Sequence, residues 1–106
     1  MKADIKSLLS EMRAGLEKIY GEHLKNVYLY GSYARGEQDE ESDVDVLIVL
    51  DRIDSYWHEI ERTGFLASGI SLKYDVTVSR AFISHQDWVR RDTPFLSNVR
   101  EEAIPA

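Results

Sequence analysis

Two carboxylates and a Gly-Ser pair stand close together in one acidic stretch of the chain, "YGSYARGEQDEESDVDVLIVL" (residues 30–50). Asp43 and Asp45 are separated by one residue and lead into an apolar run. Alternate residues of a strand point to the same face, so these carboxylates are expected to lie a few ångströms apart. Like charges at that spacing repel unless a cation lies between them, and Mg²⁺ prefers carboxylate and phosphate oxygens. The pair therefore predicts a magnesium site.

A third carboxylate, Asp75, lies in "YDVTV" (residues 74–78), whose alternating pattern predicts a strand. If that strand pairs beside residues 44–50, Asp75 completes the metal cluster and can accept the proton of an attacking hydroxyl. The structural alternative is an aspartate at a strand edge that faces water.

Gly31 and Ser32 end the short strand "NVYLYG" and offer donors to an anion. A glycine lets phosphate approach the backbone closely, while the serine hydroxyl and nearby amides can donate to it. Arg35 either reaches the phosphates as a charge clamp or faces solvent among the acids. Donors for an anion beside carboxylates for a metal are the groups that phosphoryl-type transfer requires.

The elements that must position these residues follow from hydrophobic periodicity and capping signals. The predicted order is α-β-β-α-β-α-α, which is an α+β domain with a small mixed sheet flanked by helices. The expected elements are a helix over residues 4–20 stopped by Gly21, strands over 26–31, 44–50 and 74–78, a helix capped by Asp54 or Ser55 that packs Trp57, Ile60, Leu66 and Ile70 inward, and helices beginning near Ser84 and at Thr93-Pro94.

Length and composition limit the possible functions. With 106 residues the chain is expected to form one domain, residues 1–106, with no room for a separate substrate domain. A net charge of −6, with eight acids and one base in residues 37–54, argues against direct nucleic-acid binding. The apolar runs are too short to cross a membrane, the N-terminus lacks a signal-peptide core, and there is no cysteine, so we expect a cytoplasmic protein.

The motif "GSYARG", the ten residues between Ser32 and Asp43, and a later strand carboxylate resemble the nucleotidyltransferase superfamily of the DNA polymerase β type. The small size is similar to its minimal nucleotidyltransferases. The resemblance implies the polymerase β-type fold, a triphosphate held by Gly31 and Ser32, two Mg²⁺ ions held by Asp43, Asp45 and Asp75, and ATP as substrate. It also implies an antitoxin that forms a hetero-oligomer with a HEPN-domain toxin and transfers AMP to a tyrosine of that toxin.

Two other functions stay open. The chain could be a binding antitoxin that blocks a HEPN ribonuclease by docking alone, or a small-molecule nucleotidyltransferase of the aminoglycoside-modifying kind.

Several other residues are interpreted as ordinary structural features. Arg80 and His85 have a ribonuclease-like R-x₄-H spacing but follow a predicted strand, so the match is interpreted as incidental. His23, His58 and His85 lack metal-ligand spacing. The large aromatic residues Trp57, Trp88 and Phe95 are expected in the core.

Overall fold

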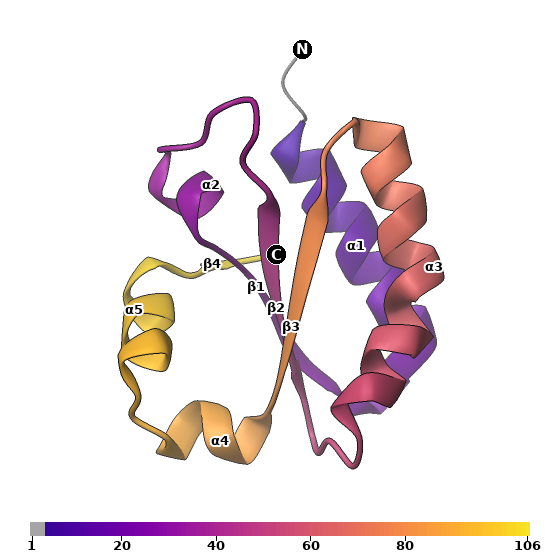
Figure 1. The fold of residues 1–106 in the computed structure, drawn as a ribbon. Helices are drawn as coiled ribbons and strands as arrows, with labels where there is room; N and C mark the ends of the chain where they lie inside the picture. The colour runs from indigo at the N-terminus through magenta and orange to yellow at the C-terminus, as the bar shows by residue number, and fades with distance from the viewer. Residues whose placement is uncertain (1–3) are drawn as a thin grey trace.

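A four-stranded sheet carries helices on both faces in the computed structural model, which describes residues 4–106 (Figure 1). The elements are α1 (Ile5–Tyr20), a 3-10 turn (Gly21–His23), β1 (Leu24–Tyr30), α2 (Ser32–Arg35), β2 (Val44–Leu50), α3 (Tyr56–Tyr74), β3 (Val78–Ser84), α4 (His85–Arg90), α5 (Pro94–Glu102) and β4 (Ile104–Pro105). The α+β prediction is confirmed, and the short α2 and β4 are additions to it.

The strands are ordered β3-β2-β1-β4, and the sheet is mixed. β1 runs antiparallel to β2 and to β4, whereas β3 runs parallel to β2. β2 is therefore a central strand, and its residues from Val46 to Leu50 are all buried. Burial on both faces explains why this strand is apolar without alternation.

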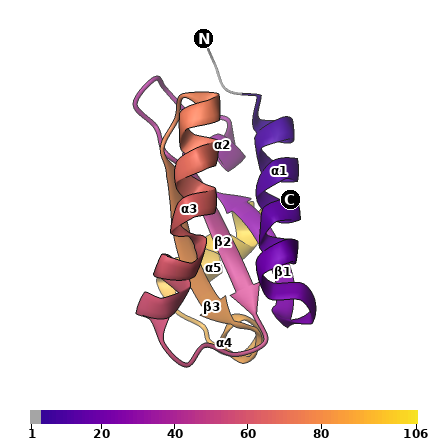
Figure 2. The ribbon, with the colours of Figure 1, turned by 90° about the vertical axis from the view of Figure 1, so that its right-hand side faces the viewer.

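The two faces of the sheet are covered differently. α1 and α3 pack side by side over one face (Figure 2). There Leu8, Met12 and Leu16 of α1 meet Val46 and Ile48 of β2 in the main core. On the opposite face Leu47 and Val49 pack against Val99 of α5, with Trp88 of α4 beside them. α2 lies over one end of β1 and β2, on the side of the sheet that carries α5 (Figure 1). The start of β2 therefore lies beneath α2.

Side-chain caps fix most helix starts where the sequence predicts them. Asp4 accepts from the Ser7 N–H at the start of α1, and Ser55, rather than Asp54, accepts from the His58 N–H at the start of α3. Ser84 caps α4 and Thr93 caps α5, whose first residue is Pro94. Each cap satisfies a backbone donor that has no partner within its helix.

The predicted third strand over residues 74–78 is wrong in position. α3 continues to Tyr74, and Asp75 ends it in the left-handed conformation with φ 54° and ψ 47°. β3 begins only at Val78. The alternation in "YDVTV" resembles a strand, but Ile70 and Ala67 continue the buried stripe of α3, so the helix extends past the point where the pattern changes.

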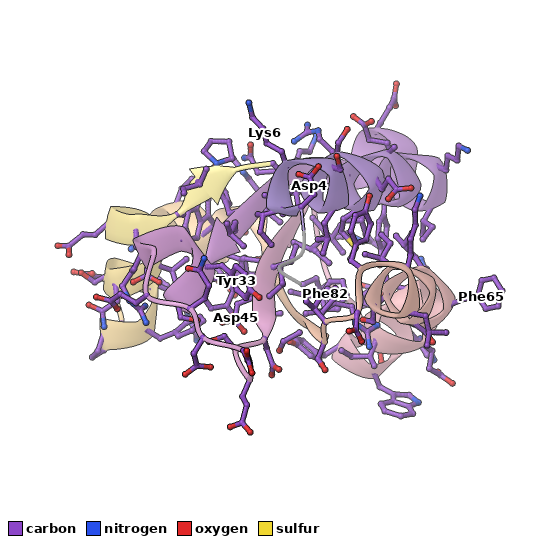
Figure 3. All side chains as sticks on the ribbon, turned by 90° about the horizontal axis from the view of Figure 1, so that it is seen from above. Asp4, Lys6, Tyr33, Asp45, Phe65 and Phe82 are labelled. Atoms are coloured by element: carbon purple, nitrogen blue, oxygen red, sulfur yellow. The ribbon has the colours of Figure 1, made fainter. Side chains whose placement is uncertain are left out.

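The expectation that Trp57 and Phe95 lie in the core is also wrong. Trp57 is 65% exposed and Phe95 is 51% exposed, whereas Trp88 is partly buried against Tyr28. α3 buries Glu59, Thr63, Ala67 and Ile70, spaced three and four residues apart. Trp57 lies off that stripe, as does Phe65, which points away from the body of the molecule in Figure 3.

Within the described part of the chain, no helix is both long and apolar enough to cross a membrane.

Candidate active site

Gly31 connects β1 to α2 in a conformation and at a position that both require glycine. Its φ is 78° and its ψ is −157°. A Cβ at this position would lie 2.2 Å from Asp45 Oδ2, far inside any van der Waals contact. The Gly-Ser turn therefore packs directly against the second carboxylate of the acidic motif, which places the two halves of the motif together.

Asp45 is the second residue of β2 and lies on the face of the sheet away from α1 and α3, below Tyr33 of α2 in the view of Figure 3. It pairs with Tyr30 of β1 and with Ser79 of β3. Val44 and Val46 point to the opposite face and are fully buried. The alternation predicted from the sequence thus places a partly exposed carboxylate near the start of the buried central strand.

The electrostatics of Asp45 reflect this crowded position. Burial raises the pKa of Asp45, and the neighbouring charges of Asp43 and Glu102 raise it further, while the Arg35 guanidinium opposes them. Burial also raises the pKa of Tyr30 to about 12, with the charge of Asp45 adding to the shift. Asp43 and Asp45 form the like-charged pair that the sequence predicts, and a divalent cation would relieve their repulsion.

Asp43 lies just before β2 and borders a hollow on the surface. This hollow of about 490 Å³ is bordered by Asp43 and Asp75 together with Ser68, Ser71 and Leu72 of α3. Asp75 is exposed and borders the hollow from the end of α3, so the structure brings Asp75 near Asp43 but does not bring it into the sheet beside Asp45. Over residues 4–106 no three acidic, histidine or cysteine side chains converge as a metal cluster.

The position opposite Asp45 on β3 belongs to Ser79. The prediction that Asp75 occupies such a strand position is therefore corrected, because the strand starts at Val78, four residues later than expected. The structure thus places Asp45 against the Gly-Ser turn, Asp43 just before β2 at the hollow, and Asp75 at the end of a helix on the border of the same hollow.

Glu102 is a site residue that the sequence reasoning missed. Its Oε2 accepts from the Gly31 N–H at 2.5 Å and from Arg35 Nη1 at 3.0 Å. The contact spans 71 residues of sequence, and Glu102 lies in the last turn of α5. Its acidic type and helical position resemble those of the exposed Glu101, so only the docking of α5 on the sheet distinguishes it.

Arg35 is held by two carboxylates. Its Nε donates to Glu37 at 2.7 Å, and its Nη1 donates to Glu102. The side chain is 43% exposed, so these pairs contribute little to stability on their own. The role of Arg35 at the phosphates stays a prediction; its guanidinium borders the Gly-Ser turn through Glu102.

A larger hollow of about 700 Å³ opens on the Asp45 face of the sheet. Its floor includes Leu47, Ala81 and Ile83, and Phe95 of α5 lies on its wall. Leu47 is two residues along β2 from Asp45, on the same face. The hollow also has Asp54, Asp87 and Arg91 in its lining, and Asp45 does not line it.

The residues interpreted as incidental make other contacts. Arg80 Nη1 donates to the Ile60 carbonyl and to Thr63 Oγ1, which ties β3 to α3. His23 Nδ1 lies 2.6 Å from Asp51 Oδ2. These contacts account for Arg80 and His23 as structural residues.

Comparisons with known proteins agree with this geometry. The model of the nucleotidyltransferase domain family matches residues 9–103. A candidate protein adenylyltransferase of Methanocaldococcus jannaschii is 41% identical over 76 residues, which cover 72% of this chain and 76% of that protein. Protein adenylyltransferase MntA of Thermococcus cleftensis is 31% identical over 81 residues, covering 76% of this chain and 80% of that protein.

Two solved structures have a similar fold. A candidate minimal nucleotidyltransferase aligns with a TM-score of 0.65 at 20% identity, covering 100% of this chain and 97% of that one. A toxin–antitoxin complex with AMP-PNP aligns with a TM-score of 0.63 at 21% identity, covering 89% of this chain and 68% of that one. The chain belongs to the nucleotidyltransferase domain family.

Proposed function

We propose that this chain transfers AMP from ATP to a tyrosine hydroxyl of a HEPN-domain toxin and thereby acts as the antitoxin of that pair. The observation that carries the proposal is the contact between Gly31 and Asp45. It places a turn that can donate to phosphate against a carboxylate that can hold a metal, with a hypothetical Cβ–Oδ2 separation of 2.2 Å.

The residues of the turn and of β2 would divide the work. The Ser32 hydroxyl and the backbone of the turn would hold the β and γ phosphates, because they present donors beside a glycine. Asp43 and Asp45 would hold Mg²⁺, with two ions in the complete site, since their like charges need a cation. When bound, the metal would neutralise the charge that develops on the phosphate oxygens.

The transfer itself forms one bond and breaks one. The acceptor oxygen bonds to the α-phosphorus of ATP, pyrophosphate leaves, and the hydroxyl proton passes to a base or to solvent. Asp75 is the carboxylate that the sequence proposes for this base. Its place at the end of α3, before β3 begins, argues against that role, because Asp75 borders a hollow with Asp43 and does not pair beside Asp45.

A partner protein would present the acceptor. The chain is small, and Asp43 borders the open hollow of about 490 Å³. The 700 Å³ hollow includes Leu47, Ala81 and Ile83 in its lining and so offers apolar surface to an aromatic side chain. The relatives named as protein adenylyltransferases support a protein acceptor. The similar toxin–antitoxin complexes support a toxin as that partner.

One observation favours the binding antitoxin as a second candidate. The Gly31 N–H is already engaged by Glu102, and the three predicted carboxylates do not converge. If Glu102 kept the Gly31 N–H and the carboxylates stayed apart with nucleotide and toxin present, docking would be the only means of blocking the toxin. Within residues 4–106 no further element encloses a second substrate, so no observation favours the small-molecule alternative.

Intact mass spectrometry distinguishes the candidates. The chain is incubated with its partner toxin, ATP and Mg²⁺, and the partner is expected to gain the mass of one or more AMP groups on tyrosine. Asp45→Asn serves as the inactive control. A partner that is neutralised without any mass gain would reject the transfer and support docking alone. Modification of aminoglycosides without a partner would support the small-molecule reading.

A further inference from the structure

Glu102 occupies the Gly31 N–H, a backbone donor of the turn that the proposed function assigns to phosphate, and it also pairs with Arg35. Its Oε2 accepts from the Gly31 N–H at 2.5 Å and from Arg35 Nη1 at 3.0 Å, and Oε1 lies 3.2 Å from the same Nη1. Its side chain is only 18% exposed. These are charge-assisted bonds, which are stronger than those between neutral groups.

A phosphate oxygen and a carboxylate oxygen compete for the same donors. One N–H cannot point at both oxygens with good geometry, and a polyphosphate close to Glu102 would add a strong repulsion between like charges. The charge of Glu102 already acts on this site, because it contributes to the raised pKa of Asp45. A triphosphate that uses the Gly31 N–H therefore has to move Glu102 away.

Glu102 is also the link between the turn and the C-terminal segment. It is the last residue of α5, and β4 begins two residues later. β4 pairs with Tyr28 and Leu29 of β1, and the Ala106 N–H donates to the Val27 carbonyl. β4 is only two residues long. Few backbone hydrogen bonds would therefore hold β4 to β1 after Glu102 loses its bonds to Gly31 and Arg35.

We propose that Glu102 is a built-in competitor for the phosphates of ATP, and that nucleotide binding displaces it from Gly31 and Arg35 and loosens the α5–β4 segment. The inference rests on the proposed function, which places the phosphates at the Gly31–Ser32 turn. Its consequence is that occupation of the nucleotide site is signalled to the surface formed by the last residues of the chain.

The test compares ATP binding, in the presence of Mg²⁺, to the wild type and to Glu102→Gln by titration calorimetry. Glutamine keeps the shape of the side chain but removes the charge, so it is a weaker competitor. The dissociation constant of Glu102→Gln is expected to fall at least about fivefold, at the lower end of ordinary coupling between sites. Glu101→Gln, an exposed neighbour with the same charge, is the matched control and should bind like the wild type.

Hydrogen exchange of the wild type provides a measurement that needs no variant. ATP is expected to speed the exchange of the backbone amides of residues 104 and 106. Unchanged or weaker ATP binding by Glu102→Gln, or unchanged exchange in a wild type saturated with ATP, would overturn the displacement while leaving the phosphate site in place. Absence of ATP binding by all three proteins would overturn the phosphate site itself, and the displacement with it.

Discussion

The carboxylates of Asp45 and Glu102 contact the same residue, Gly31, from two sides. Asp45 Oδ2 lies 2.2 Å from the point where a Cβ would be, and Glu102 Oε2 accepts from the backbone N–H at 2.5 Å. These two acids come from β2 and α5, so the Gly-Ser turn is fixed by elements that are distant in sequence. The turn is therefore sensitive to any added side chain.

Gly31→Ala is expected to destabilise the fold and to weaken ATP binding. The added methyl would clash with Asp45, and a φ of 78° is strained for alanine. Gly36→Ala is a matched control, because Gly36 has a φ of 72° but nothing lies near its hypothetical Cβ. Urea unfolding should show a loss of about 1 kcal/mol for Gly36→Ala, from backbone strain alone, and a loss larger by about 1–3 kcal/mol for Gly31→Ala. Equal losses in the two variants would show that the turn can move away from Asp45.

Asp45→Asn should separate activity from stability. Because burial and the charges of Asp43 and Glu102 raise the pKa of Asp45, its ionised form is less stable in the folded chain than in the unfolded one. The wild type therefore loses stability as the pH rises through the raised pKa of Asp45. Asparagine removes this loss, so the variant should be more stable than the wild type at neutral pH, and the difference should shrink as the pH falls into the acid range.

The same Asp45→Asn variant should lose AMP transfer on the order of 100-fold or more, since a metal-binding carboxylate is removed. Glu40→Gln, an exposed change in the acidic loop, should alter neither property. Urea unfolding across pH and the partner's mass gain measure the two effects. A variant that is less stable than the wild type at neutral pH would contradict the account of Asp45 as a destabilised anion.

Local signals specified most of the fold from the sequence. The run over residues 44–50 is apolar on both faces, which identifies a central strand whatever covers it. The Ser55, Ser84 and Thr93 caps act through bonds to amides three residues away, so they can be read from neighbouring positions. The closeness of the Gly31–Ser32 turn to Asp45 also depends on neighbouring elements, because β1 and β2 are consecutive and antiparallel.

Long-range packing set the rest of the fold and of the site. The end of α3 depends on how Ile70 packs on the sheet, so the pattern of residues 74–78 misled the assignment of Asp75. Glu102 could not be distinguished from Glu101 until α5 was docked. Trp57 was expected in the core on hydrophobicity alone, yet its angular position on α3 leaves it in solvent.

Tyr30→Phe should change how stability depends on alkaline pH. Burial and the charge of Asp45 raise the pKa of Tyr30 from its ordinary 10.0 to about 12. Between these values the unfolded chain releases the proton while the folded chain keeps it, so the stability that Tyr30 contributes is lost as the pH rises. The stability difference between wild type and variant should be constant below pH 10.0 and should shift against the wild type above it. Unfolding free energies on both sides of that pH measure this, and a constant difference throughout would show that Tyr30 ionises normally.

Asp75→Asn tests the carboxylate that the structure places away from Asp45. Asp75 adopts a φ of 54° at the end of α3, a conformation that asparagine tolerates well, so the variant should fold normally. Because Asp75 caps a helix and does not lie on β3, transfer should stay within about threefold of the wild type, equivalent to about 0.7 kcal/mol in the barrier.

Asp43→Asn is the comparison, since Asp43 borders the same hollow yet adjoins Asp45, and it should lose most of the activity. The rate of mass gain by the partner measures both variants. Loss of transfer in Asp75→Asn with ATP binding retained would instead assign the proton-accepting role to Asp75, and would require the end of α3 to move toward β2 when the substrates bind.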